Sequence, residues 1–245
     1  MKIALAASPV RTGDVPYNLS SMLQTVAQCS GKADMVLFGE TSLQGFDCLV
    51  WDYETDRQMA VSLDDPRMMQ ICNAAKRYRI AISFGYIEKT EDALYSSQIV
   101  VDDTGIVSQN FHRVSVGWKE YRRTDEHYRE GANFEAFRYR GKKFAIGLCG
   151  DLWTDGRPEE MKALNACLVL WPVWCDYNAA EWNESIKYEY AEQAALCGER
   201  VLLVNPFCAD PDAACSAAGG AVYFRNGSIV KELPAGKSGV LIVEV

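Results

Sequence analysis

Residues 144–153 read FAIGLCGDLW, a pattern that predicts a buried strand ending directly before the side chain of a cysteine. Residues 144–148 are apolar, Cys149 follows them directly, and Gly150 follows the cysteine. A sharp strand-to-loop turn at this point would expose the sulfur and turn backbone N–H groups toward it, as beside an oxyanion hole. The alternative interpretation is a buried structural thiol, which describes most cysteines.

A second strand end carries an acid. Residues 35–47 read MVLFGETSLQGFD, so Glu40 comes two residues after a buried run, with Gly39 allowing a close backbone approach. Strand ends at the rim of a sheet are where α/β proteins place their sites. A carboxylate there suits a general base. A helix cap or a solvated loop acid is the alternative.

A third stretch, residues 112–131, is dense in charged and aromatic side chains and too irregular for one amphipathic helix. It supplies the cations Arg113 and Lys119 and the anions Glu120 and Glu126, although a solvated surface loop would have the same composition. Neither of the two histidines is well placed to pair with a cysteine, so a hydrolase with a histidine base is possible but not preferred.

The remaining sequence alternates between strands and helices without a linker, repeat or low-complexity tract, which predicts one α/β domain over residues 1–245 with mixed sheets. Asn226-Gly227 between two β-rich runs predicts a hairpin. The predicted strands are residues 2–7, 35–38, 80–88, 94–101, 144–148, 167–171, 201–204, 220–224, 228–232 and 240–245. The predicted helices are residues 18–30, 66–78, 157–166 and 181–197.

Composition excludes several classes of protein. The chain has 245 residues, 49% of them hydrophobic and 24% charged, which are values of a folded globule and not of a disordered chain. The formal net charge of −8 would repel nucleic acid and anionic membrane surfaces, and no apolar run approaches the ~20 residues needed to span a bilayer. Nine cysteines without a CxxC pair argue against a structural zinc site. Reduced thiols and no export signal predict a cytoplasmic protein.

Taken together, these stretches resemble the nitrilase superfamily of carbon–nitrogen hydrolases. MVLFGETSLQGFD is similar to that family's strand, catalytic Glu and Ser-Leu-x-Gly, and IGLCGDLW to its Cys-x-Asp-Leu nucleophile motif. FGYIEKTEDALYSSQIVVDDTGIV resembles the family's hairpin, with Ser96 where Asn is usual. LVLWPVW, EYAEQAALCGERVLLVN and GGAVYFRNGSIV resemble later segments in the same order. The resemblance covers nearly the whole chain.

The resemblance implies a four-layer α-β-β-α sandwich of two mixed sheets, with Glu40 and Cys149 as catalytic residues. One position departs from the family pattern, since Arg113 stands where the family's lysine is expected. Arginine holds an anion but releases no proton near neutral pH, whereas lysine can do both. We expect Lys119, which follows a glycine at 117, to fold back into the lysine's place, with Arg113 as a supporting residue. Filling of the position by Arg113 in an impaired or altered enzyme is the alternative.

The implied reaction is hydrolysis of a small amide or carbamoyl compound through a Cys149 thioester. The resemblance implies Glu126 as a second acid, the Gly150 N–H as an oxyanion donor, Trp174 as part of the substrate pocket, and no metal or organic cofactor. Family members usually assemble, so a homodimer or higher homo-oligomer is expected. Two other functions stay open: a binding or scaffold protein that has lost hydrolysis, and an amidase subunit that feeds ammonia to a synthase.

Overall fold

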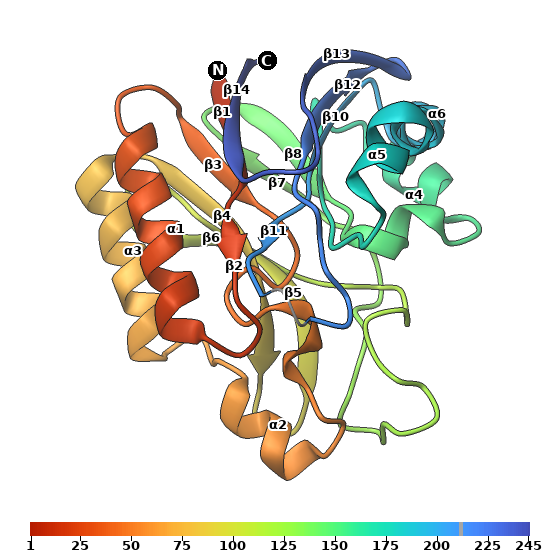
Figure 1. Ribbon diagram of the computed structural model, residues 1–245. Helices are drawn as coiled ribbons and strands as arrows, with labels where there is room; N and C mark the ends of the chain where they lie inside the picture. The colour runs from red at the N-terminus through yellow and green to blue at the C-terminus, as the bar shows by residue number, and fades with distance from the viewer. Residues whose placement is uncertain (211–212) are drawn as a thin grey trace.

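The computed structural model describes residues 1–210 and 213–245, whose strands form two large mixed sheets packed face to face. Helices cover the outer face of each sheet, α1 and α3 on one side and α4 and α6 on the other (Figure 1). The layers therefore run helix, sheet, sheet, helix, and the predicted four-layer sandwich is confirmed.

The first sheet has the strand order β14-β1-β3-β4-β5-β6. Its central strands β1, β3 and β4 are parallel, while β14, β5 and β6 join the sheet antiparallel. The bounds are β1 Lys2–Ala7, β3 Met35–Phe38, β4 Ala81–Lys89, β5 Leu94–Val101, β6 Val107–His112 and β14 Gly239–Glu244.

The second sheet has the order β13-β12-β10-β9-β8-β7, with β8, β9 and β10 parallel. Its bounds are β7 Ala136–Tyr139, β8 Lys142–Ile146, β9 Leu168–Pro172, β10 Arg200–Val204, β12 Ala221–Arg225 and β13 Ser228–Leu233. Asn226 and Gly227 both have positive φ, of 48° and 74°, as a tight hairpin turn between β12 and β13 requires. A short parallel pair, β2 (Pro9–Val10) and β11 (Phe207–Cys208), lies outside both sheets.

The helices begin where the sequence supplies caps. The Asp14 side chain accepts a hydrogen bond from the Tyr17 N–H at the start of α1, and Asp65 caps α3 in the same way. The bounds are α1 Val15–Cys29, α2 Tyr53–Met59, α3 Pro66–Tyr78, α4 Arg157–Ala163, α5 Ala179–Glu181 and α6 Lys187–Cys197, with a π-helical turn, η3 Trp182–Ile186, joining the last two. Two short 3₁₀ helices are η1 Phe46–Cys48 and η2 Cys149–Trp153.

Strand β1 contributes side chains to the apolar clusters on both faces of the first sheet. Ile3 and Leu5 belong to the apolar cluster between the sheets, whereas Ala4 and Ala6 belong to the cluster beneath α1 and α3. Successive side chains of a strand point to opposite faces, so a strand buried on both sides reads as a continuous apolar run. This alternation fixes which face of the first sheet meets the second sheet.

The carboxyl ends of the central strands meet at one rim of the sandwich. The chain leaves β3 through Gly39 and Glu40, and the Glu40 N–H donates to the carbonyl oxygen of Val173, just past β9, at 3.3 Å. A Cβ at Gly39 would lie 2.4 Å from Cδ of Pro206, so glycine alone fits there. The two sheets are thus joined directly beside the candidate acid.

Candidate active site

Glu40 is completely buried at the end of β3. Its Oε1 accepts hydrogen bonds from Nη1 of Arg113 at 2.8 Å and from Oγ of Ser96 at 3.1 Å. Among the described residues, nothing donates to its other oxygen, Oε2, although that atom is buried as well. A buried carboxylate with one oxygen anchored and the other unpartnered can accept a proton without losing its orientation.

Arg113 directly follows β6 and is 4% exposed. Its Nε donates to Oγ of Ser115 at 2.8 Å, in addition to the Nη1 contact with Glu40. Burial lowers the pKa of Arg113, but the negative charges of Glu40 and Asp151, and that of Cys149 whenever its thiol is ionised, outweigh burial, and the net direction is upward. The guanidinium is therefore a permanent cation of the site.

Cys149 begins η2 with a φ of +48°, which places it in the left-handed region that side chains other than glycine rarely adopt. Its Sγ lies 3.7 Å from the carbonyl oxygen of Trp174. A hydrogen bond with the Cys175 thiol, burial and the charge of Glu40 raise the pKa of Cys149 well above its ordinary value, while Arg113 lowers it. The resting thiol is therefore neutral and needs a base to become a nucleophile.

Asp151 connects the nucleophile turn to the segment that carries Arg113. Its Oδ1 accepts the N–H groups of Val114 at 3.0 Å and Ser115 at 2.8 Å, and its Oδ2 accepts that of Leu148 at 2.9 Å. Burial is the main cause that raises the pKa of Asp151 to about 6. The Cys-x-Asp-Leu motif contains this aspartate, but the motif alone does not show that the aspartate binds the segment after Arg113.

The predicted placement of Lys119 is wrong. Its Nζ pairs with Oε1 of Glu130 at 2.7 Å and donates to the carbonyl oxygen of Tyr128, and Arg113 occupies the place beside Glu40. The physical reason is the anchoring of Val114 and Ser115 on Asp151, which fixes the chain immediately after Arg113 and leaves Lys119 in a separate turn.

The predicted placement of Glu126 as a second acid of the site is also wrong. Glu126 is exposed, and the contact it makes is through its carbonyl oxygen, which accepts from Nε of Arg129 at 2.9 Å. The half-buried acid of this loop is Glu130, which pairs with Lys119 and accepts the indole N–H of Trp118 at 3.2 Å. Both acids precede a glycine in one irregular loop, and no periodicity distinguishes them.

The two other predicted residues lie beside Cys149. Gly150 is the next residue in η2, at the first turn, where helix N–H groups have no intrahelical acceptor. Trp174 contacts the thiol through its carbonyl oxygen, while its indole is 4% exposed, stacks on Phe46 and donates to the carbonyl of Cys215 at 3.1 Å. The indole is thus largely committed to packing.

Sequence reasoning did not assign roles to four residues that surround these groups. Ser96, noted only as a departure from the family pattern, donates to Glu40, and Ser115 accepts from Arg113. The indole N–H of Trp171 donates to the Cys149 carbonyl oxygen at 2.9 Å, and the thiol of Cys175 lies 3.1 Å from Oη of Tyr190. Ser96 lies on β5 and Ser115 in the segment after β6, and a short polar side chain at either place carries no sequence signal of such a contact.

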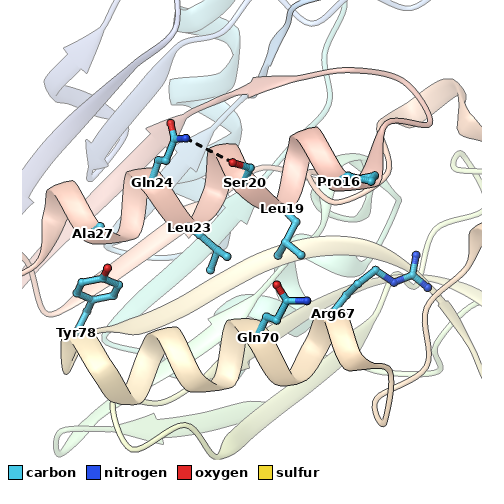
Figure 2. Close-up of a pocket in the computed structure, with 9 residues that line it drawn as sticks. All are labelled: Pro16, Leu19, Ser20, Leu23, Gln24, Ala27, Arg67, Gln70 and Tyr78. Atoms are coloured by element: carbon cyan, nitrogen blue, oxygen red, sulfur yellow. Dashed lines mark hydrogen bonds between the residues drawn. The ribbon is translucent and has the colours of Figure 1, made fainter.

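Two further features bear on ligands. Within residues 1–210 and 213–245, no group of three or more His, Cys, Asp or Glu side chains is arranged to hold a metal ion. A groove of about 620 Å³ lies between α1 and α3. Figure 2 shows the residues that line it, among them Leu19, Leu23 and Tyr78. This groove lies on the outer helical layer and includes none of the site residues.

In the described residues, 1–210 and 213–245, none of the helices combines the length and apolarity that a membrane span requires.

Comparison with known proteins gives an amidase and a nitrilase among the relatives. An (R)-stereoselective amidase of Pseudomonas sp is 30% identical over 170 residues, which are 69% of this chain and 59% of the amidase. A probable nitrilase of Schizosaccharomyces pombe is 25% identical over 192 residues, 74% of this chain and 66% of the relative. The chain thus spans 59% and 66% of the lengths of these two relatives.

Solved structures share the fold. A CN-hydrolase superfamily protein of Xanthomonas campestris, with an arsenic adduct in its active site, superposes with a TM-score of 0.80 at 17% identity, covering 99% of this chain and 89% of its own. A glutamine-dependent NAD+ synthetase of Acinetobacter baumannii gives 0.77 at 24% identity, covering 98% and 44%. The profile of the carbon–nitrogen hydrolases matches residues 2–245. The chain belongs to the carbon–nitrogen hydrolase family.

Proposed function

We propose that this chain hydrolyses the C–N bond of a small amide or carbamoyl compound through a thioester on Cys149. The observation that carries the proposal is the buried carboxylate of Glu40, which has one oxygen held by Arg113 and Ser96 and the other, Oε2, unpartnered among the described residues. Similarity to an amidase and a nitrilase supports the same class of reaction.

In the first half-reaction, Glu40 takes the proton of the Cys149 thiol, and the thiolate attacks the carbonyl carbon. Arg113 and the Gly150 N–H stabilise the negative charge that develops on the carbonyl oxygen. The C–N bond breaks as protonated Glu40 gives its proton to the leaving nitrogen, so ammonia or an amine departs and the acyl group stays on the sulfur as a thioester.

In the second half-reaction, Glu40 removes a proton from water, and the resulting hydroxide adds to the thioester carbon. The C–S bond breaks, the proton held by Glu40 returns to the sulfur, and the acid leaves. Arginine does not release protons near neutral pH, so Glu40 carries every proton and Arg113 contributes only its charge and hydrogen bonds.

The test is to incubate the protein with a panel of amides and carbamoyl compounds, measuring intact mass and released ammonia. We expect an acyl adduct on Cys149 and ammonia release, both lost in Cys149→Ala. Cys29→Ala, at the end of α1, is the matched cysteine control and should keep turnover. Turnover that survives in Cys149→Ala would contradict the mechanism.

A specific observation favours a second candidate. The buried ion pair between Arg113 and Glu40, where the resemblance implies lysine, fits a protein that binds an acyl compound without hydrolysing it. In that case the same panel would give saturable binding, measured by calorimetry, with neither adduct nor ammonia.

A further inference from the structure

The guanidinium group of Arg113 lies against two glycines. A Cβ at Gly150 would be 2.8 Å from Nη2 of Arg113, closer than real Cβ atoms come to other heavy atoms, and a Cβ at Gly117 would be 3.0 Å from the same nitrogen. Neither glycine has a φ in the left-handed region, so backbone conformation does not require glycine at these positions. What a side chain at either position would meet is the tip of Arg113.

The guanidinium cannot move aside without losing hydrogen bonds. Nη1 donates to Oε1 of Glu40 at 2.8 Å, and Nε donates to Oγ of Ser115 at 2.8 Å. Ser115 is itself held, because its N–H donates to Asp151 at 2.8 Å. Two anchored partners, Glu40 and Ser115, therefore fix the plane of the guanidinium, and the group is buried, where an unpaired donor is costly.

A lysine at position 113 would not need this space. Counted along the side chain, the lysine Nζ stands at the place of the arginine Cζ, and lysine has no atom corresponding to Nη2. A Cβ at Gly150 would lie 3.9 Å from Cζ of Arg113, which is an ordinary van der Waals contact. Arginine at position 113 therefore requires a glycine at position 150, whereas lysine at position 113 would leave room for a side chain there.

We propose that Gly150 and Gly117 are positioning residues that make room for the Arg113 guanidinium, so that arginine is the accommodated cation of this site and not the trace of a lost lysine. The proposal deepens the proposed function, on which it rests only in taking Cys149 as the group that Arg113 assists. It assigns both glycines a role through Arg113, separate from any contact with substrate.

The test is a double-mutant cycle read on the thiol, which requires no known substrate. The protein, Gly150→Ala, Arg113→Lys and the double variant are alkylated with iodoacetamide across a pH series, and peptide mass spectrometry follows Cys149. The ionisable groups around this thiol include Glu40, Cys175, Arg113 and Tyr190. Displacing the cation should raise the pH midpoint of alkylation and slow the reaction at neutral pH by about tenfold, equivalent to one pKa unit.

In the Arg113→Lys background, the same Gly150→Ala change should alter the rate by less than about twofold, because lysine has no Nη2 for the alanine Cβ to meet. The difference between the two backgrounds measures the coupling of positions 113 and 150. Gly117→Ala should act in the same direction as Gly150→Ala and less strongly, because its Cβ would meet only Nη2 of Arg113, at the longer distance. Agreement of both glycines would support the shared role.

Equal effects of Gly150→Ala in the two backgrounds, or no effect in the arginine background, would overturn the proposal. Thermal unfolding of each variant separates a loss of fold from a displaced guanidinium, and Gly117→Ala gives a second reading where Gly150→Ala fails to fold. The outcome is independent of the proposed function, which fails instead when the unmodified protein forms no adduct and releases no ammonia.

Discussion

At the scale of single residues, the nucleophile is held in an unfavourable backbone conformation. Cys149 has a φ of +48°, which for a residue with a Cβ costs roughly 1–2 kcal/mol. The surrounding contacts offset that cost, because the Cys149 carbonyl accepts from Trp171 and the preceding N–H, of Leu148, is bound by Asp151. The strained turn keeps the sulfur at the rim of the sheet.

We expect Arg113 and Lys119 to contribute unequally to turnover. Arg113→Met should lower kcat by about 10²–10³, the usual effect of removing one group that stabilises the oxyanion. Lys119→Met should cost less than about tenfold because Lys119 pairs with Glu130 away from Glu40. Steady-state kinetics on whichever amide gives the Cys149 adduct measures both. A larger loss in Lys119→Met would restore the sequence-based assignment.

The cysteines also test the structure directly. Cys167 is the first residue of the apolar run CLVLW, which favours an inert core thiol, but it precedes β9 and its side chain is exposed. Cys175 is 7% exposed and lies against Tyr190. We expect native alkylation to label Cys167 well before Cys175, with urea-unfolded protein as the control in which both react. Peptide mass mapping at short reaction times shows which of the two cysteines is labelled first, and earlier labelling of Cys175 would contradict the expectation.

Residue positions were predictable where regular structure fixes them. Glu40 and Cys149 follow apolar strand runs whose ends are readable, and their positions at the sheet rim follow from that. Lys119 and Glu126 lie in a loop without periodicity, where the path is set by contacts from Asp151 and by the pairing of Lys119 with Glu130. Such tertiary contacts leave no local pattern in the sequence.

At the scale of elements, strands β4, β5 and β6 carry a buried polar cluster beside the site. Glu88, on β4, accepts from Ser97 on β5 at 2.7 Å, from Asn110 on β6, and contacts Nε2 of His112 at 2.9 Å. Arg113 is the next residue after His112, so the cluster anchors the strand end from which the cation projects.

The stability of this cluster should depend on pH. Burial raises the pKa of Glu88, but hydrogen bonds from His112, Ser97 and Asn110 outweigh it and bring the pKa below its ordinary value of 4.5. A carboxyl group with a lowered folded pKa stabilises the fold above its unfolded pKa, and this contribution is lost as pH falls through the folded pKa. Glu88→Gln should flatten the dependence of unfolding free energy on pH below 4.5.

Urea unfolding from pH 3 to pH 7 measures this difference, with exposed Glu91→Gln at the turn after β4 as the matched control. Parallel pH curves for the unmodified protein and Glu88→Gln would refute the expectation.

Predicted and observed elements agree for helix 66–78, whose caps are local. The sequence did not predict the π-helical turn Trp182–Ile186. Helical periodicity does not show whether each N–H donates to the carbonyl four or five residues earlier.

At the scale of the whole molecule, the helical layer next to the site exposes apolar side chains. Trp153 and Tyr177 are 43% and 40% exposed, and both contact the ring of Tyr190 on α6. On α6 itself, Tyr188 and Leu196 are more than half exposed. Exposed aromatic side chains of this kind are enriched at protein–protein interfaces.

We therefore expect a homodimer or higher homo-oligomer that uses this layer. Sedimentation at micromolar concentration should give a species heavier than the 27.3 kDa chain, as a specific interface of ~1,600 Å² would hold at that dilution. Leu196→Glu should shift the equilibrium toward monomer. Leu63→Glu, which changes an exposed leucine before α3, is the control. A single species of chain mass for the unmodified protein would contradict the expectation.

The alternation of apolar strands with helices predicted an α/β domain with mixed sheets, while the four-layer sandwich was implied by the family resemblance and not by that pattern. The pairing of β1 with β14 was not predictable, since nothing local links two segments so far apart. The amide of Val245 donates to the carbonyl of Met1 at 2.9 Å, and the Met1 amino group donates back to Val245, 244 residues away.

That pairing sets an order for folding on the ribosome. β1 can pair with β3 early in synthesis, but its other edge has no partner until β14, residues 239–244, has been made, after the other strands of both sheets. The pairing of β1 with β14 joins the strands of the two sheets that lie farthest apart in the sequence, and contacts of such long sequence separation slow folding. Until that pairing forms, β1 has an open backbone edge, on which nascent chains can pair with one another.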